Sequence, residues 1–225
     1  MATTYVSPLL RLGVAADIVR PQLRLLAADA SPPTAIRGLT IKEITLNKDF
    51  DGWFDDDSEI YFISTALDFS GKDPVVFPVG DATQTTLKLE PGETFRFSLG
   101  EGAPVFPERE ITSGLVVQVH LFESDQGARD AAAAITKATD AVKTDGNLVK
   151  VLKQLFENPG GLAVDVVLGA AGEVAKVVSA VLESNGNDNV AFFTGYWSAE
   201  GSWDGKLEAT QEGASIRFGE LPPTA

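Results

Sequence analysis

The segment EIYFISTALDF, residues 59–69, decides the fold, because aromatic and β-branched residues dominate it as they do in half-buried strands. The segment GLVVQVHLFE, residues 114–123, has the same character. Strands at close spacing, with no helix between them, indicate antiparallel β structure and therefore a sandwich or a barrel. Shorter runs of strand type, separated by turn-forming residues, occur at residues 39–46, 73–81, 83–93 and 94–100.

Two of the shorter runs predict local features. The run LTIKEITL, residues 39–46, alternates apolar and polar side chains with one slip, which predicts a β-bulge. The stretch TLKLEPGETFRF, residues 86–97, predicts a hairpin that turns at Pro91-Gly92.

A block of helical spacing, residues 126–186, interrupts the strand pattern. Helices are predicted near residues 128–142, 148–156 and 162–182, with turn-forming clusters between them. Strand character returns at the C-terminal side. The order predicts an antiparallel β-sandwich, residues 39–225, that carries an inserted helical hairpin or bundle, and an N-terminal helical or extended arm, residues 1–38. The late strand runs are residues 190–199, 206–211 and 214–221.

Composition excludes several functions. The 225 residues carry 18 Lys and Arg against 32 Asp and Glu, a formal net charge of −14. Such an acidic chain does not suit nucleic acid, which requires a surplus of cationic side chains, or an anionic membrane without a bridging cation. The sequence has no Cys and one His, which removes disulfides, thiol nucleophiles, cysteine-ligated metals and His-rich zinc sites.

The sequence predicts neither a Sec signal peptide nor a membrane-spanning helix. The first 30 residues have no basic residue before Arg11, and their apolar run is interrupted, unlike a Sec signal peptide. The longest apolar segment, residues 161–182, contains Asp165, Glu173 and Lys176, which favours an amphipathic helix over a membrane span. We therefore expect a soluble protein that is cytoplasmic or exported by a non-Sec route.

Acidic residues concentrate in three segments at strand ends. The segment DFDGWFDDDSE, residues 49–59, places six carboxylates in eleven residues between two predicted strands. The other segments, residues 122–126 and 184–189, flank the two ends of the helical insertion and should therefore lie close together. Calcium takes six to eight oxygen ligands from such flexible loops. Solvated surface charge, helix capping at Asp125 and ordinary turn chemistry at Asp188 are the alternatives.

Two of these regions resemble the C-two domains, a family of calcium- and lipid-binding β-sandwiches. In residues 39–68 a strand leads into an acidic loop, and Glu59-Ile60-Tyr61 stands where the family has an acidic residue before Pro-Tyr. Residues 114–125 resemble a later family strand that ends in two acids one residue apart. The resemblance implies a C-two-like sandwich with calcium ligands at Asp51, Glu59, Glu123, Asp125 and Asp188. We add Asp57 because it lies two residues before Glu59.

Catalytic patterns are scarce. His120 is predicted on the strand face opposite Val117 and Val119, and no G-x-S-x-G, P-loop or dinucleotide-binding motif accompanies it. Trp197 and Trp203 form either an aromatic platform for sugar rings or ordinary packing at a strand edge.

The sequence therefore favours a non-enzymatic, calcium-binding β-sandwich module that presents its helical insertion to a protein partner or a membrane. The N-terminal arm is a second candidate contact, and a homo-oligomer is compatible with it. Two alternatives stay open: a structural or effector subunit of a multiprotein particle without bound metal, and a carbohydrate-active or hydrolytic enzyme.

Overall fold

The computed structural model describes twelve parts of the chain, and all structural statements below concern these residues. They are residues 5–7, 34–49, 58–68, 74–77, 86–97, 102–112, 114–124, 128–145, 164–183, 188–201, 203 and 207–221.

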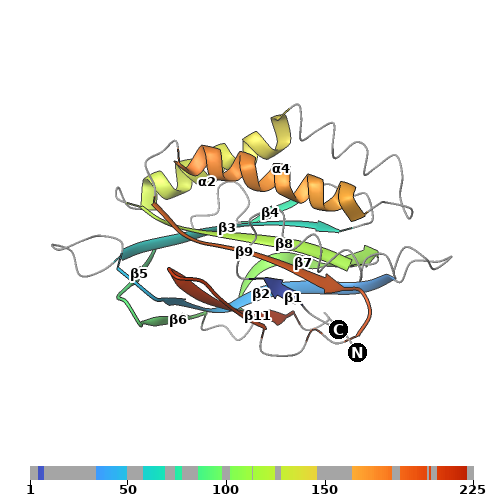
Figure 1. Ribbon diagram of the computed structural model, residues 1–225, viewed down its shortest axis with the longest axis horizontal. Helices are drawn as coiled ribbons and strands as arrows, with labels where there is room; N and C mark the ends of the chain where they lie inside the picture. Colours follow the sequence, from blue (N-terminus) through green and yellow to red (C-terminus); the bar gives the residue numbers. More distant parts are fainter. Residues whose placement is uncertain are drawn as a thin grey trace.

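Two antiparallel sheets pack face to face and a helical layer covers the outer face of one of them (Figure 1). Sheet A has six strands in the order β1-β9-β8-β3-β4, with β5 also paired to β3. Its strands are β1 (Tyr5–Ser7), β3 (Ser58–Asp68), β4 (Val75–Phe77), β5 (Leu87–Leu89), β8 (Gly114–Glu123) and β9 (Asp188–Ser198). Sheet B has five strands in the order β10-β11-β2-β6, with β7 also paired to β2. Its strands are β2 (Thr34–Leu46), β6 (Thr94–Arg96), β7 (Ala103–Thr112), β10 (Leu207–Thr210) and β11 (Ala214–Glu220).

The helical insertion lies between β8 and β9, two strands that pair with each other. Its described helices are α2 (Ala128–Thr144) and α4 (Val164–Glu183). The predicted β-sandwich with an inserted helical segment is therefore confirmed. The predicted short helix at residues 148–156 lies outside the described residues.

The central strands of sheet A are buried on both faces. All ten residues of β8 are buried, and so are ten of the eleven residues of β3. Residues such as Phe62 and Val119 enter the core between the sheets, whereas Ile63 and Phe122 belong to a second core under the helices. A strand covered on both sides requires a nearly continuous apolar sequence, which explains the composition of these two strands.

The helices contribute small side chains to the second core. Ala131, Ala134 and Ala138 of α2 are fully buried there, as is Val174 of α4. A stripe of Ala and Val at helical spacing allows the helices to approach the sheet closely.

Sheet B has a polar outer face, as an antiparallel sheet with one solvated side should. The carboxylate of Glu43 on β2 accepts hydrogen bonds from Arg96 on β6, at 3.0 Å, and from Arg217 on β11. The register of β2 and β11 shifts between Arg217 and Phe218, which leaves Lys42 as an extra residue. The bulge predicted in residues 39–46 is therefore confirmed.

The predicted hairpin at residues 86–97 is wrong in its pairing, although the turn is present. Glu93 N–H donates to the Glu90 carbonyl at 2.9 Å, and Gly92 has a φ of 87°, as a type II turn requires. Strand β5 nevertheless pairs with β3 and β6 pairs with β2, so the turn carries the chain from sheet A to sheet B. The residues of the turn determine that the chain reverses direction here, but packing in the two cores determines which strands β5 and β6 pair with.

Strand β7 has no counterpart among the predicted strands, because Pro104, Pro107 and several charged residues weaken its strand pattern. Among the described strands, β7 pairs only with β2, so one of its two sides has no strand neighbour. Prolines and charged residues are tolerated in such an edge strand. Gly102 precedes it with a φ of 81°, and a Cβ there would lie 2.4 Å from the Ile41 carbonyl oxygen.

The region predicted as an N-terminal arm, residues 1–38, is described at its two ends only. Tyr5–Ser7 forms β1 at the edge of sheet A beside β9, and Thr34–Gly38 belongs to β2. The helix-like stretch in between lies outside the described residues. Within the described chain, no helix has the length and hydropathy that a membrane crossing needs.

One side chain links the edge of sheet A to sheet B. Phe192 N–H of β9 donates to Gln211 Oε1 at 3.0 Å, and the Gln211 side-chain amide donates to the Phe192 carbonyl. Gln211 follows β10, so its amide replaces a neighbouring strand at this point of the edge.

Candidate cation site at one end of the sandwich

Three of the predicted calcium ligands lie on neighbouring strands at one end of the sandwich. We call this the acidic end; here β2 and β8 end and β3 and β9 begin. Glu123 pairs with Ile60 on one side and with Asp188 on the other. Ser124 N–H donates to the Glu59 carbonyl oxygen at 3.0 Å. Antiparallel pairing across the helical insertion thus brings the strand positions of Glu59, Glu123 and Asp188 to one sheet end, as the sequence suggested. Glu123 is on the face of Ile60 and the inter-sheet core, whereas Glu59 is on the helix-facing side with Tyr61.

The three side chains have different surroundings. Glu59 is partly exposed, and its Oε1 lies 3.3 Å from Nζ of Lys88, which is directly opposite on β5. Asp188 is exposed to solvent. Glu123 is only 1% exposed. A carboxylate removed from water requires compensating charge or hydrogen bonds, so the environment of Glu123 differs most from that of a solvated surface acid.

The Tyr61 hydroxyl has a raised pKa, and the Glu123 carboxylate is one of the two causes. Burial raises the pKa of the Tyr61 hydroxyl above its ordinary value, and the nearby Glu123 carboxylate raises this pKa further. Both effects disfavour a tyrosinate, because a second negative charge would stand in a poorly solvated place. The phenol therefore stays protonated beside Glu123.

The other three predicted ligands, Asp51, Asp57 and Asp125, lie outside the described residues. Asp57 and Asp125 are the immediate chain neighbours of the described residues Ser58 and Ser124. Within the described chain, no group of three His, Cys, Asp or Glu side chains is placed to hold a metal ion. The described carboxylates share an end of the sheet without forming a complete ligand set by themselves.

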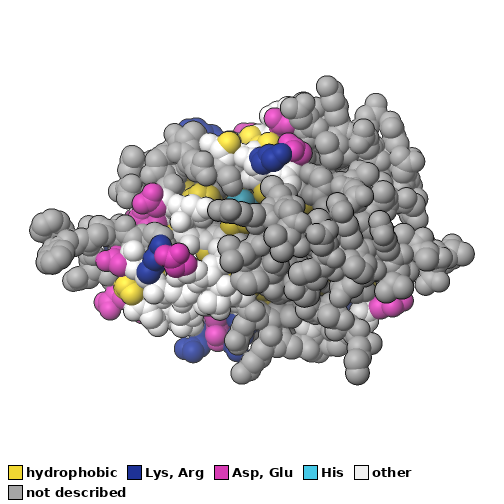
Figure 2. Space-filling model, in the orientation of Figure 1, with side chains coloured by type: hydrophobic (Ala, Val, Ile, Leu, Met, Phe, Trp, Pro, Cys, Tyr) yellow, Lys and Arg dark blue, Asp and Glu magenta, His cyan; other side chains and the backbone are white. Residues whose placement is uncertain are grey.

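Much of the described surface charge is locally neutralised. Acidic and basic side chains lie beside one another on the face shown in Figure 2. Lys48 Nζ lies 3.0 Å from Glu212 Oε1, and Lys176 Nζ lies 2.6 Å from Glu173 Oε1. Exposed pairs of this kind contribute little to stability, but they remove isolated charge from the surface.

His120 lies on the helix-facing side of β8, opposite Val117 and Val119 of the inter-sheet core, as predicted. Its side chain is 2% exposed, and burial lowers its pKa from 6.5 to about 3. Such an imidazole is neutral and has no access to a substrate in solution.

The two candidate sugar-binding tryptophans are core residues. Trp197 and Trp203 are 0% and 1% exposed. Trp197 packs edge-on against Phe218 with ring centroids 5.3 Å apart, and lies 6.4 Å from the ring of Trp203. Of the two interpretations of this aromatic pair, the packing one is therefore confirmed.

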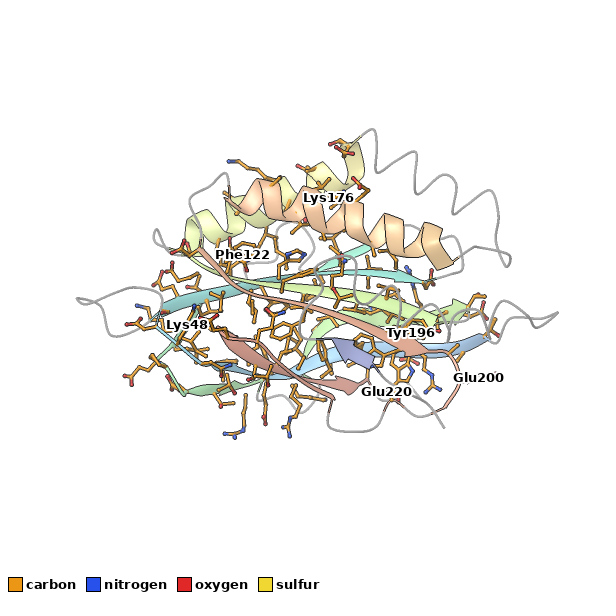
Figure 3. All side chains as sticks on the ribbon, viewed as in Figure 1. Lys48, Phe122, Lys176, Tyr196, Glu200 and Glu220 are labelled. Carbon is orange, nitrogen blue, oxygen red and sulfur yellow. The ribbon has the colours of Figure 1, made fainter. Side chains whose placement is uncertain are left out.

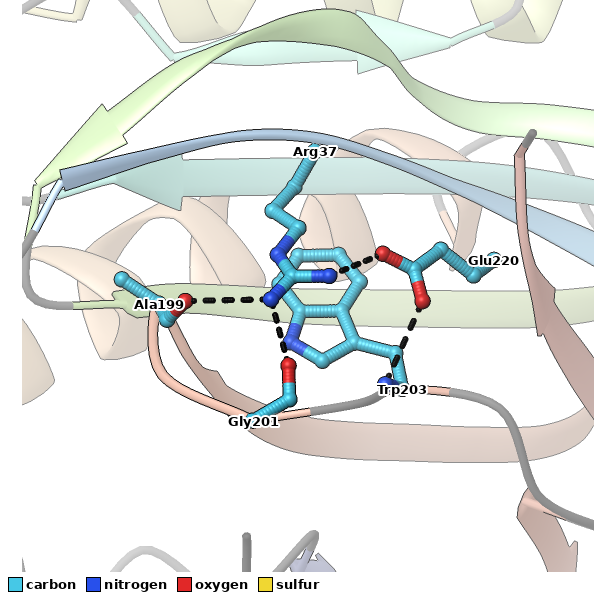
Figure 4. Close-up of polar contacts among 5 residues, drawn as sticks. All are labelled: Arg37, Ala199, Gly201, Trp203 and Glu220. Atoms are coloured by element: carbon cyan, nitrogen blue, oxygen red, sulfur yellow. Dashed lines mark hydrogen bonds and ion pairs between the residues drawn. The ribbon is translucent and has the colours of Figure 1, made fainter. Parts of the chain in front are cut away.

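A network around Arg37 was missed in the sequence (Figure 4). The Arg37 guanidinium donates to the carboxylate of Glu220, to the Gly201 carbonyl and, at 3.3 Å, to the Ala199 carbonyl. It also lies 5.4 Å from the ring centroid of Trp203, whose backbone N–H donates to Glu220 at 3.2 Å. Arg37 thus fastens the segment after β9 to strands β2 and β11. No sequence signal marks it, because Glu220 is 183 residues away.

A second ion pair lies next to this network. Arg109 of β7 is directly opposite Arg37 of β2, and its Nη2 lies 3.6 Å from Oδ2 of Asp68, whose side chain is fully buried. The Arg109 guanidinium also covers the ring of Phe106 at 4.6 Å. Two arginines and two carboxylates therefore balance one another, and this arrangement suits structural support better than anion binding.

Comparison with known family models, curated proteins and solved structures finds no match for this chain.

Proposed function

We propose that this protein is a non-enzymatic binding module whose acidic end takes up a calcium ion and whose helical layer contacts a partner. One observation carries the proposal: strand pairing gathers Glu59, Glu123 and Asp188 at a single end of sheet A. Asp57 and Asp125 adjoin these positions in the chain. Calcium is the cation that suits carboxylates supplied by several loops, because it accepts many oxygen ligands in flexible geometry.

The proposed site needs ligands from the described strands and also from the acidic segments that adjoin them in the chain. The described carboxylates do not complete a site alone, so Asp51, Asp57 and Asp125 supply the remaining oxygens in this proposal. Calcium would also have to compete with Lys88 for the Glu59 carboxylate, because Lys88 Nζ lies 3.3 Å from Glu59 Oε1. Calcium binding should therefore weaken as the ionic strength rises, because mobile ions screen the attraction between exposed charges.

The helical layer contributes a polar outer surface to the proposed function. Its apolar stripe is already used against sheet A. Thr136, Lys137 and Asp140 of α2 and Lys176 of α4 are exposed. A mixed polar surface of this kind fits a protein partner better than the interior of a membrane.

The test is calcium-dependent stability. A ligand that binds only the folded state at about 100 times its Kd adds about 2.7 kcal/mol to the free energy of unfolding. For a chain of this size that corresponds to a rise in Tm of roughly 5–10 °C. Calorimetric titration should show one saturable site for calcium, weaker binding of magnesium, and loss of the Tm increase with EDTA.

Matched variants locate the site. Asp188→Asn and Asp125→Asn should abolish the calcium-dependent rise in Tm. Glu200→Gln is the control, because Glu200 lies at the opposite end of the molecule from Lys48, which follows β2 at the acidic end (Figure 3). If calcium leaves the Tm of the unmodified protein unchanged, the calcium proposal is wrong, and a metal-free structural or effector subunit becomes the better hypothesis.

A further inference from the structure

The face of sheet A that the helical layer covers carries one buried imidazole among apolar side chains. His120 sits between Ile63 of β3 and Phe192 of β9 in the register of sheet A. The centroid of its ring lies 4.4 Å from the ring centroid of Phe192 and 6.2 Å from that of Phe122. The rings of His120 and Phe122 are nearly parallel. Its Nε2 is buried and accepts or donates no hydrogen bond within the described part of the chain.

No charged group faces this imidazole closely from the described elements around it. On β3, the same face carries the neutral phenol of Tyr61 and, nearer the strand start, Glu59 paired with Lys88. On β8 and β9 the nearest positions on this face, residues 118 and 194, are Gln and Thr. The described buried stripes of α2 and α4 contain only uncharged residues, and the described charged residues of both helices are at least partly exposed.

Protonation of His120 is therefore incompatible with the packed helical layer. A buried cation with no counter-charge is strongly disfavoured, which is the physical reason that burial lowers the His120 pKa. Opening the layer removes that penalty, because the imidazolium then contacts water. A proton thus binds the open form much more tightly than the closed form.

The helical layer is also the weaker of the two contacts that sheet A makes. Its helix side consists mainly of Ala and Val, whereas the inter-sheet core contains Phe62, Phe106, Trp197 and several Leu and Ile. Small side chains bury less apolar area and stabilise less. Separation of the helices should therefore precede separation of the sheets.

We propose that His120 makes the contact between the helical layer and sheet A an acid-sensitive latch, so that protonation releases α2 and α4 while the two sheets stay packed. The released state exposes the apolar faces of the helices and of sheet A to another surface. This latch does not depend on calcium and does not rest on the proposed function.

The test is hydrogen exchange measured segment by segment between about pH 7 and pH 4, corrected for intrinsic exchange rates. Protection of the α2 and α4 amides should fall about tenfold for each pH unit below about 6.5, while β2 and β11 keep their protection. His120→Phe should remove this pH dependence, and Thr136→His, on the exposed face of α2, should leave it unchanged. The latch is refuted if His120→Phe retains the pH dependence, or if helices and sheets lose protection together.

A second measurement avoids any folding defect of the variant. His120 is the only histidine, so its imidazole NMR signals in the unmodified protein are unambiguous. While the helices stay protected, these signals should keep the chemical shifts of a neutral ring down to about pH 5. Titration of the packed protein near pH 6.5 overturns the proposal, because the proton would then bind without opening the layer.

Discussion

Replacing Arg37 tests how strongly the segment after β9 is fastened to sheet B. The substitution Arg37→Met keeps the aliphatic stem and removes the guanidinium from the Glu220 carboxylate and the Gly201 carbonyl. The two charged side chains are only 19% and 15% exposed, so Glu220 would lose its counter-charge in a poorly solvated place. Breaking such a pair by removing one partner costs about 3–5 kcal/mol, and the residual exposure favours the lower end, about 3 kcal/mol.

Equilibrium unfolding in urea should separate the pair from its surroundings. In a double-mutant cycle with Arg37→Met and Glu220→Met, we expect a coupling of about 2 kcal/mol, because the double variant leaves no charge behind. The same cycle at the exposed pair Lys48–Glu212, whose side chains are 46% and 86% exposed, should give about 0.5 kcal/mol. Equal couplings at the two pairs would refute the reasoning, since burial is the property that distinguishes them.

Two further expectations follow from the packing. Gly195→Ala places a Cβ 2.2 Å from the ring of Trp197 and should lower the free energy of unfolding by about 3 kcal/mol. Gly92→Ala, where φ is 87° and no atom lies within 4 Å, should lower it by only about 1 kcal/mol, and equal losses in urea unfolding would contradict this difference. Because the pKa of Tyr61 is raised in the folded state, the protonated phenol contributes fully to the free energy of unfolding below pH 10. This contribution is lost as the pH rises further. Phenolate absorbance should accordingly show at least one of the three tyrosines un-ionised well above that pH until the protein unfolds, and ionisation of all three in the native state near pH 10 would disprove it.

The strands and helices with strong patterns were predictable because each pattern reflects a single local environment. Continuous apolar runs mark β3 and β8, which are covered on both faces, and the Ala-rich stripe marks α2. Strand β7 was missed because its prolines are compatible with a sheet edge but not with a strand pattern. The partners of β5 and β6 were assigned wrongly because a turn defines a reversal without defining which sheet each arm joins.

The candidate site was predictable only in part. Glu59, Glu123 and Asp188 were expected together because antiparallel strands flanking an insertion must bring its ends together, and the register agrees. The side chains of Glu59 and Glu123 nevertheless belong to opposite faces of sheet A, because Glu123 is directly opposite Ile60 of the inter-sheet core and Glu59 is the next residue along β3. Their exposure differs accordingly. Whether Asp51, Asp57 and Asp125 join them remains a prediction that calcium titration tests.

The sequence by itself determined the order of elements, the insertion and the acidic composition, because these depend on periodicity and residue type within short windows. Only the tertiary structure decided that the helices cover the outer face of sheet A, that His120 is buried on that face, and that Arg37 pairs with Glu220. Those features depend on residues far apart in the chain. Burial and charge pairing are properties of the assembled layers, so no local pattern records them.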